Sequence, residues 1–261
     1  MEDFIKQIKN PIACNVNGKA YTVSELTADE GYYTFAIRLP ASVACRDIAL
    51  SASFTVDGDT YTASYTLSTL KYAEKLLASS TSTAERALIC DMLAYVKSAY
   101  AYFGTEGAEE IASAIDALIG DGASSFEKIS DTNGSMAVGA GVNGVTFILD
   151  AEPKIRFYFA EGTDLTNYAF KIDGVAQKFT ATSETIGETN FVCADISLFA
   201  YKMIGTVEVY NGSTKLGSFH INDYYDFALT QNNSALTEVV ERFYMYCKSA
   251  GAYRDEVIAG Q

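Results

Sequence analysis

His220 is the only histidine in the chain, so any Ser-His-Asp triad or multi-histidine metal site would have to use it. It lies in the strand-like run SFHIND, immediately before an expected helix. The sequence contains no GxSxG nucleophile elbow and no HExxH helix that would supply a catalytic partner or a second metal ligand. We therefore expect His220 to be an ordinary residue at the end of a strand.

The segment Asp131-Thr132-Asn133-Gly134-Ser135 is similar to the start of a calcium-binding loop. Such a loop needs oxygen ligands at alternate positions and a bidentate acid at position twelve, where this chain has Val142. A linker is the favoured interpretation, with weak calcium binding as the alternative. Other acids are explained by local hydrogen bonding in turns. These turn acids are Asp57, Asp59 and Asp121.

Two pairs of neighbouring carboxylates are candidates for the acids of a glycosidase, namely Glu109 with Glu110 and Asp150 with Glu152. Nothing in the sequence fixes the separation on which that chemistry depends. We therefore predict no catalytic, metal-binding or cofactor-binding residue. A Lys to Asn or Asp isopeptide bond, which joins residues distant in sequence, stays open, and an intact mass without loss of ammonia or water would reject it.

Tyrosines are the remaining candidates for ligand contact. Four of them lie on or beside helical apolar stripes, where packing is the expected role. These four are Tyr100, Tyr102, Tyr244 and Tyr246. The cluster Tyr224, Tyr225 and Asp226 is the predicted surface for contact with a glycan or a protein.

Charge and composition limit the classes of partner. The chain has 261 residues and a net charge of −14, so it would repel the phosphate backbone of nucleic acids and anionic membranes. No run approaches the roughly 18 apolar residues of a membrane span, and MEDFIKQIKN lacks the pattern of a signal peptide. The 18 Tyr and 15 Phe, with no Trp, favour a β-rich protein. We expect neither nucleic-acid binding nor membrane insertion of this segment.

Five cysteines are too few and too scattered for a disulfide framework, and no CxxC pair indicates zinc or redox chemistry. Most are expected to be buried as small apolar side chains. Cys90 and Cys247 in particular fall on apolar stripes of predicted helices. The others are Cys14, Cys45 and Cys193.

An internal repeat organises the chain. YVKSAYAY from Tyr95 and YCKSAGAY from Tyr246 are identical at six of eight positions. Upstream matches follow in the same order at similar offsets, which indicates a duplicated module. These are VDGDTYTASY with YNGSTKLGSF, and ACNVNGKA with AFKIDGVA.

Each copy begins with strand signals. Asp57-Gly58 and Asn211-Gly212 stand between alternating apolar segments and predict hairpins with type I′ turns. Asn17-Gly18 and Asp173-Gly174 repeat the signal earlier in each copy. Alternating apolar residues predict two further strands, each with one buried face. They are Val145, Phe147 and Leu149 in the first, and Ile155, Phe157 and Phe159 in the second.

Helical signals follow the last hairpin of each copy. In copy one the apolar period becomes that of a helix, first from Leu67 to Leu77 and again from Leu88 to Phe103. Ser82 and Glu85 form a predicted capping box, and Gly104 is expected to end the second helix. In copy two the stripe runs from Leu236 to Ala250, after the capping residues Asn232-Asn233-Ser234.

The copies differ at their beginnings. Copy two has about twenty-five strand-like residues, 145–168, before the shared start at Ala169, whereas copy one has only residues 1–12 before Ala13. Copy one is therefore expected to lack strands, either because the chain is a fragment or because they come from elsewhere, since an open sheet edge seeks a partner. A short helix over 109–119, flanked by glycines, is expected between the copies.

The segments LKYAEKLL and LICDMLAYVKSAYAYF resemble a recurring pattern in very large secreted or wall-attached proteins of anaerobic Firmicutes. That pattern is a hairpin, a Tyr-Ala helix and a helix of the form Leu-Val-x-Ala-Met-Leu-x-Tyr-x-x-x-Ala-x-x-Tyr-Phe. VVERFYMYCKSAGAY in copy two departs from it by losing Met-Leu and the closing Phe. The resemblance implies a β-sandwich with a helical hairpin in a multi-module surface protein, and it assigns no ligand residues.

Together these patterns predict an α+β chain of two tandem modules, each an antiparallel β-sandwich-like sheet followed by a two-helix hairpin. The expected boundaries are 1–104 for copy one, 105–138 for the linker with its short helix, and 139–261 for copy two. The expected function is a non-catalytic module pair at the cell wall or outside the cell, with a protein or glycan partner. The alternatives are a carbohydrate-binding module of a secreted polysaccharide-processing system and a secreted hydrolase.

Overall fold

The computed structural model describes residues 13–16, 19–21, 27–29, 32–34, 39–56, 59–128, 139, 141–149 and 153–260, with side chains from residue 39 onward except 54–56. These residues divide into two compact units. Unit 1 comprises 1–38 and 44–73, and unit 2 comprises 39–43 and 74–261. Within the described residues, five α-helices and antiparallel sheets confirm the predicted α+β class.

Unit 1 is built on a four-stranded antiparallel sheet with the order β2-β1-β5-β6. Its strands are β1 (Ala13–Val16), β2 (Lys19–Tyr21), β5 (Ile48–Val56) and β6 (Asp59–Leu67). A separate hairpin consists of β3 (Thr27–Asp29) and β4 (Tyr32–Thr34). The helix α2 (Thr69–Ser79) follows β6 directly.

Unit 2 contains two four-stranded antiparallel sheets. The first has the order β11-β12-β8-β7, with β7 (Gly144–Ile148), β8 (Lys154–Ala160), β11 (Thr180–Ile186) and β12 (Thr189–Ser197). The second has the order β10-β9-β13-β14, with β9 (Tyr168–Ile172), β10 (Val175–Gln177), β13 (Val207–Asn211) and β14 (Thr214–Phe219). Short 3-10 turns occur at η2 (Ala41–Val43), η3 (Leu165–Asn167) and η4 (Ala200–Lys202).

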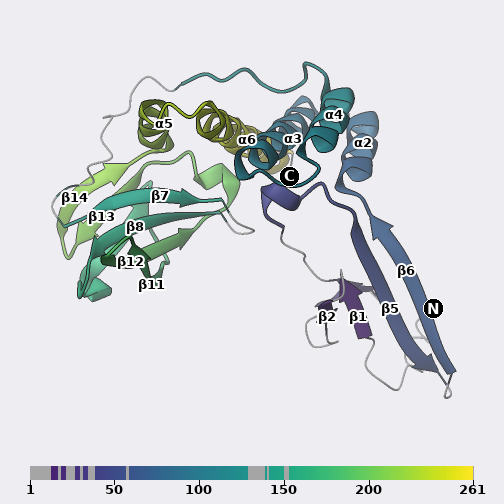
Figure 1. The fold of residues 1–261 in the computed structure, drawn as a ribbon, viewed down its shortest axis with the longest axis horizontal. Helices are drawn as coiled ribbons and strands as arrows, with labels where there is room; N and C mark the ends of the chain where they lie inside the picture. The colour runs from purple at the N-terminus through teal and green to yellow at the C-terminus, as the bar shows by residue number, and fades with distance from the viewer. Residues whose placement is uncertain are drawn as a thin grey trace. The chain divides into compact units, whose positions relative to one another are not determined.

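One hydrophobic core joins the two sheets of unit 2 to its helices. Phe157 of β8 contacts Phe170 of β9 at 4.9 Å between ring centroids, so the two sheets share their buried faces. Phe243 belongs to the same core and lies on α6 (Ser234–Ala259). Figure 1 shows α6 and α5 (Ile221–Thr230) along one side of these sheets. The alternating pattern predicted for β7 and β8 is confirmed, because Val145, Phe147 and the aromatic residues of β8 are buried.

The helix α3 (Thr83–Phe103) packs along α6 within unit 2, and α4 (Ala108–Ile119) packs on α3. Tyr95 of α3 contacts Phe243, whereas Asp91, one turn earlier on α3, bonds Ser249, later on α6. The two helices therefore run antiparallel. This packing puts α3 in the same compact unit as β7 to β14, although the repeat assigns it to residues 1–104, and the predicted module boundaries stay a prediction.

Local signals placed the helix ends correctly. Ser82 is the N-cap of α3, where its side chain accepts a hydrogen bond from the Glu85 N–H at 2.9 Å. Gly104 ends α3 with a φ of 61°, a conformation that suits glycine. Asn233 caps α6 and accepts from the Leu236 N–H at 3.1 Å. The short helix expected over 109–119 is α4.

The predicted hairpins are present, but one predicted turn type is wrong. Asp173 and Gly174 both have positive φ between β9 and β10, as a type I′ turn requires. Asn211 instead pairs with Thr214 in the ladder, so the loop is Gly212-Ser213, and of these two residues only Gly212 has positive φ. A register shift at Val209/Tyr210 accompanies this change. Asp57-Gly58 and Asn17-Gly18 lie outside the described residues.

The elements of the two halves follow one order. In the first half it is β1, β2, β3, β4, η2, β5, β6, α2 and α3, and in the second half β9, β10, β11, β12, η4, β13, β14, α5 and α6. The sheet orders β2-β1-β5-β6 and β10-β9-β13-β14 correspond strand by strand. The segment 1–12 ahead of β1, where a counterpart of β7 and β8 would stand, lies outside the described residues.

Four cysteines are buried free thiols, which confirms the packing role predicted for Cys90 and Cys247. The side chain of Cys14 lies outside the described residues. Of the helices in the described ranges, none is both long and apolar enough to cross a bilayer.

Candidate functional site at the edge of strand β7

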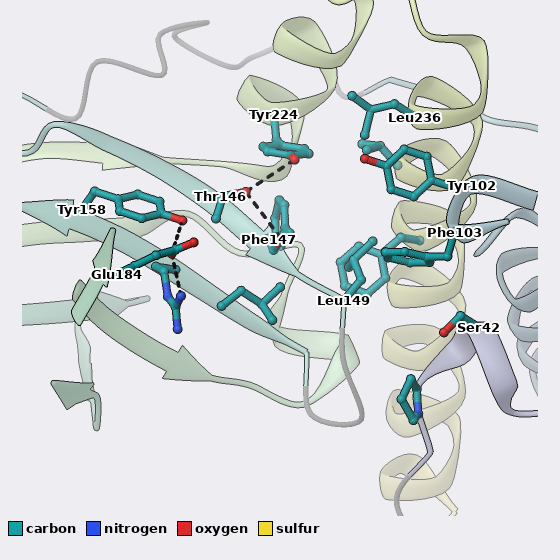
Figure 2. A pocket seen from close by; sticks show the side chains of 15 residues that line it. Ser42, Tyr102, Phe103, Thr146, Phe147, Leu149, Tyr158, Glu184, Tyr224 and Leu236 are labelled. Atoms are coloured by element: carbon teal, nitrogen blue, oxygen red, sulfur yellow. Dashed lines mark hydrogen bonds and ion pairs between the residues drawn. The ribbon is translucent and has the colours of Figure 1, made fainter. Parts of the chain in front are cut away.

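A cavity of about 590 Å³ lies along β7, an edge strand of the first sheet of unit 2 (Figure 2). Four consecutive residues of this segment, 146–149, line it. Because successive side chains of a strand point to opposite faces, a cavity lined by all four must follow the edge of the strand. The cavity therefore borders backbone groups as well as side chains.

Aromatic rings form one end of the cavity. Phe147 of β7 is perpendicular to Tyr224 of α5, with centroids 5.2 Å apart, and it also contacts Phe243 of α6 at 5.6 Å. Tyr102 and Phe103 close the same end from the last turn of α3, which Gly104 terminates (Figure 2). Phe103 is 49% exposed, so this end presents an accessible ring.

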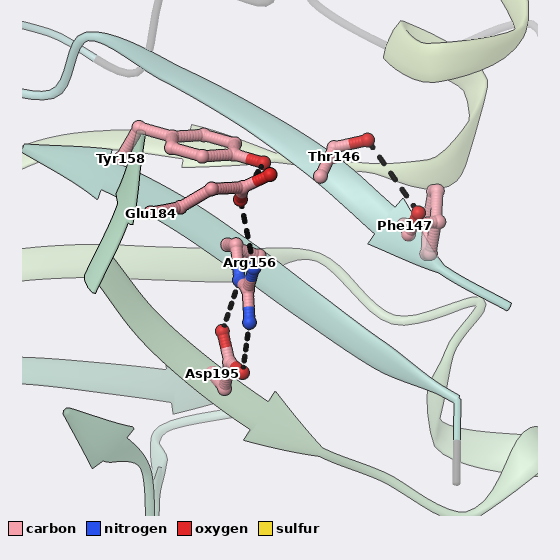
Figure 3. Close-up of polar contacts among 6 residues, drawn as sticks. All are labelled: Thr146, Phe147, Arg156, Tyr158, Glu184 and Asp195. Atoms are coloured by element: carbon pink, nitrogen blue, oxygen red, sulfur yellow. Dashed lines mark hydrogen bonds and ion pairs between the residues drawn. The ribbon is translucent and has the colours of Figure 1, made fainter. Parts of the chain in front are cut away.

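An ion-paired network forms the other end (Figure 3). Arg156 of β8 donates from Nε and Nη2 to the two carboxylate oxygens of Asp195, both at 2.6 Å. Its Nη1 donates to Glu184 Oε2 at 2.7 Å. Arg156 and Asp195 are direct partners in the β8–β12 ladder, so the sheet register sets this bidentate geometry. The hydrogen bonds to Asp195 are the main cause that raises the pKa of Arg156.

Tyr158, two residues along β8 on the same face, joins the network by donating to Glu184 Oε2 at 2.9 Å. Burial, reinforced by this hydrogen bond, raises the pKa of Tyr158 to about 12. The phenol therefore stays protonated at neutral pH and acts as a donor rather than a base. Two carboxylates, those of Asp195 and Glu184, share the Arg156 guanidinium, so these hydrogen bonds hold the side chains in fixed orientations.

The predicted contact cluster on α5 is divided between two surroundings. Tyr224 lines the cavity, and its hydroxyl lies 3.5 Å from that of Thr146, the outer limit of a hydrogen bond. Tyr225 instead donates to Glu241 at 3.1 Å and packs its ring on Phe126. Asp226 forms an ion pair with Lys128. Consecutive helical residues point in different directions, so these three side chains do not share one surface, and their role in contact stays a prediction.

His220 is the N-cap residue of α5. Its Nδ1 accepts from the Asn222 N–H at 3.1 Å, and its Nε2 is 2.8 Å from the Ile204 carbonyl, so Nε2 carries the proton. Asp223 completes a capping box by accepting from the His220 N–H at 2.7 Å. Burial lowers the pKa of His220 and raises that of Asp223. Nδ1 thus caps the start of α5, while Nε2 binds the backbone at Ile204.

The other candidates from the sequence are dispersed or not described. Glu109 and Glu110 are exposed in the first turn of α4. Tyr100 and Tyr244 are buried, and Tyr246 stacks on Tyr95. The segment 131–135, together with Asp150 and Glu152, lies outside the described residues.

Sequence reasoning missed the network of Arg156, Glu184 and Asp195. One signal was present: Arg156 interrupts the run Ile155, Phe157 and Phe159 at an alternate position, which marks the face opposite the core. The partners come from strands whose pairing follows only from the fold.

No protein-family model matches the chain, and a comparison with curated proteins finds no relative.

Proposed function

We propose that the chain is a pair of non-catalytic modules of an extracellular or wall-attached protein, which space or display other domains and contact a protein or glycan partner. The two modules derive from one ancestral module by duplication. Each has a sandwich-like β-region and a two-helix hairpin. The equal order of nine elements and the equal strand order of two sheets support the duplication.

The observation that carries this proposal is the packing of α3 on α6. The rings of Tyr95 and Tyr246 stack with centroids 5.8 Å apart and an angle of 7°. These two tyrosines open the matching segments YVKSAYAY and YCKSAGAY. Corresponding residues of two helices meet in this way where the helices are related by a local twofold axis, as in an isologous interface. Direct association of one module with the next is what a spacer needs.

The assignment is tested in two steps. Antibody labelling of intact cells of the producing organism should detect the protein, and labelling that requires permeabilised cells would reject the surface location. The purified chain should give no turnover on a broad panel of glycosides and esters. Turnover that survives repurification would overturn the non-catalytic assignment.

Glycan binding is the second candidate, and the cavity at β7 favours it. Exposed Phe103 at one end and the hydrogen-bonding pair Tyr158 and Glu184 at the other combine a ring for stacking with polar groups for hydroxyls. Affinity electrophoresis on a polysaccharide panel tests it. Phe103→Ala should abolish retention, whereas Phe199→Ala should not, because Phe199 is 73% exposed but does not line the cavity. Absence of retention on every polysaccharide would reject this candidate.

A further inference from the structure

The two faces of the β5–β6 hairpin in unit 1 differ in chemistry. Ser51 pairs with Ser64, and Ser53 with Thr62, so one face carries small hydroxyl side chains. The other face carries Leu50 opposite Tyr65 and Ala52 opposite Ala63. Directly opposed residues of an antiparallel pair point to the same side, so this second face is apolar. We call it the Tyr65 face.

The Tyr65 face is open among the described residues. Tyr65 is 65% exposed, Ala63 is exposed and Leu50 is half-exposed. β6 is exposed on both of its faces over nearly its whole length. An amphipathic sheet normally buries its apolar face against a second layer.

The second half of the chain shows what covers the corresponding face. In the matching segments VDGDTYTASY and YNGSTKLGSF, Tyr65 corresponds to Phe219. The ladders agree, because Leu50 pairs with Val16 of β1 and with Tyr65, just as Val207 pairs with Ile172 of β9 and with Phe219. Val16 and Ile172 are matching residues of ACNVNGKA and AFKIDGVA. Phe219 and Val207 are 1% and 0% exposed, respectively.

Two aromatic residues that contact Phe219 come from the two strands that have no counterpart among the described residues of the first half. Its ring lies 5.6 Å from Phe147 of β7 and 6.2 Å from Phe157 of β8. Leu50 and Tyr65 thus stand where the second half has core residues. Within the described part of unit 1, no strands correspond to β7 and β8.

We propose that the Tyr65 face is a docking surface for a two-stranded antiparallel ribbon of the β7–β8 type, supplied by a partner polypeptide. Such a ribbon presents aromatic or branched apolar side chains at every second position, as Phe147 and Phe157 do. The proposal rests on the duplication and names the partner class of copy one. It makes copy one an acceptor of a strand pair that packs on the sheet as a second layer.

A single tryptophan can report on this face, since the chain has none of its own. Tyr65→Trp places the reporter on the Tyr65 face, and Ser64→Trp places it on the opposite face of β6. The probe is the chain's own ribbon, added as a second copy of residues 143–167 in front of Met1 of the full chain. The control extension carries the Phe147→Asp and Phe157→Asp changes within the added segment.

With the intact extension we expect the emission of the Tyr65→Trp reporter to shift to the blue and its quenching by acrylamide to fall at least twofold. The Ser64→Trp reporter should not change, and the control extension should leave both reporters as in the unextended chain. An unchanged Tyr65→Trp reporter, or an equal shift with the control extension, would overturn the proposal. Each variant is checked by circular dichroism and thermal unfolding.

A second copy of the chain is the competing occupant. If light scattering finds the unextended chain to be a dimer in which the Tyr65→Trp reporter is already shielded, the face serves self-association and the ribbon proposal is wrong. Neither outcome affects the panel for turnover or the polysaccharide retention test, so failure of this inference is distinguishable from failure of the proposed function.

Discussion

The carboxylate of Asp91 on α3 accepts a hydrogen bond from the hydroxyl of Ser249 on α6, across 158 positions of the sequence. The same carboxylate accepts from the backbone N–H of Ser124 at 2.7 Å and from the Ser124 hydroxyl at 2.8 Å. Asp91 is 1% exposed. A buried carboxylate with three donors therefore fastens both long helices of unit 2 to the segment that follows α4.

Replacing Asp91 should destabilise unit 2. Asp91→Ala removes three hydrogen bonds to a charged acceptor and leaves buried donors unsatisfied, so we expect a loss of roughly 2–4 kcal/mol in the free energy of unfolding. Ser249→Ala should cost about 1 kcal/mol because only one of these bonds is lost. Urea denaturation followed by circular dichroism measures both changes.

Asp116→Ala is the matched control. Asp116 pairs with Lys97 on the surface, where its side chain is 57% exposed, and such pairs contribute less than about 1 kcal/mol. An equal loss for Asp91→Ala and Asp116→Ala would contradict the structural role of the buried carboxylate.

The stacked pair Tyr95 and Tyr246 should show a measurable coupling energy. In a double-mutant cycle with Tyr95→Leu and Tyr246→Leu, the loss in the double variant should be smaller than the sum of the single losses by about 0.5–1.5 kcal/mol. A second cycle that combines Tyr95→Leu with Phe191→Leu should be additive, since Phe191 contacts the ring of Tyr158, whereas Tyr95 contacts those of Phe243 and Tyr246. Additivity in both cycles would remove the energetic support for the packing of α3 on α6.

Local signals made much of the fold predictable. Ser82, Asn233 and Gly104 act within one turn of their own position, so the sequence indicates the helix ends directly. The Asp173-Gly174 turn is equally local. By contrast, the turn near Asn211 depends on a register shift in its ladder, which adjacent residues do not reveal. The α+β class and the strand pattern followed from local periods.

Non-local packing was not predictable in the same way. Asp91 lies in a helical segment with an apolar stripe, and nothing near Asp91 in the sequence indicates that Ser249 will be its partner. Tyr224 reaches the cavity only because α5 follows β14 with that rotation, and the same rotation turns Tyr225 toward Glu241. The cavity combines residues of β7, β8 and β11 with residues of α3, α5 and α6, so only the assembled unit defines it.

Arg156 should matter for stability mainly through the carboxylate that it neutralises. Asp195 is 4% exposed, so Arg156→Met would leave a buried charge without its bidentate partner and cost about 3–5 kcal/mol. Combining Arg156→Met with Asp195→Asn should recover part of that loss, because the uncompensated charge is removed. Thermal and urea unfolding measure the three variants.

Lys215→Met provides the comparison, because it breaks an exposed cross-strand pair with Glu208 and should cost far less stability than Arg156→Met. If the double variant at positions 156 and 195 were less stable than Arg156→Met alone, the burial of an unpaired carboxylate would not be the cause of the loss.

His220 should make the stability depend on pH in a defined direction. Burial lowers the pKa of His220 in the folded chain below its usual value of 6.5. On acidification the unfolded chain therefore binds the proton first, so this contribution to stability is complete above pH 6.5 and declines as the pH falls toward the folded pKa. Because the chain has one histidine, a single imidazole signal in the NMR spectrum reports its titration.

The variant His220→Asn removes the titration of the imidazole and keeps that of the carboxylates. Asparagine can still accept the hydrogen bond of the Asn222 N–H but does not titrate, so the decline in stability between about pH 7.5 and 5.5 should be shallower than in the wild type. Asp223, whose pKa is raised by burial, acts with the opposite sign and stabilises the fold as the pH decreases through its folded pKa. The imidazole also lowers the pKa of Asp223, so the difference between the two pH profiles includes this coupling, and the NMR titration of His220 in the wild type isolates the imidazole itself. A midpoint of the imidazole signal at or above 6.5 would contradict the neutral, buried N-cap.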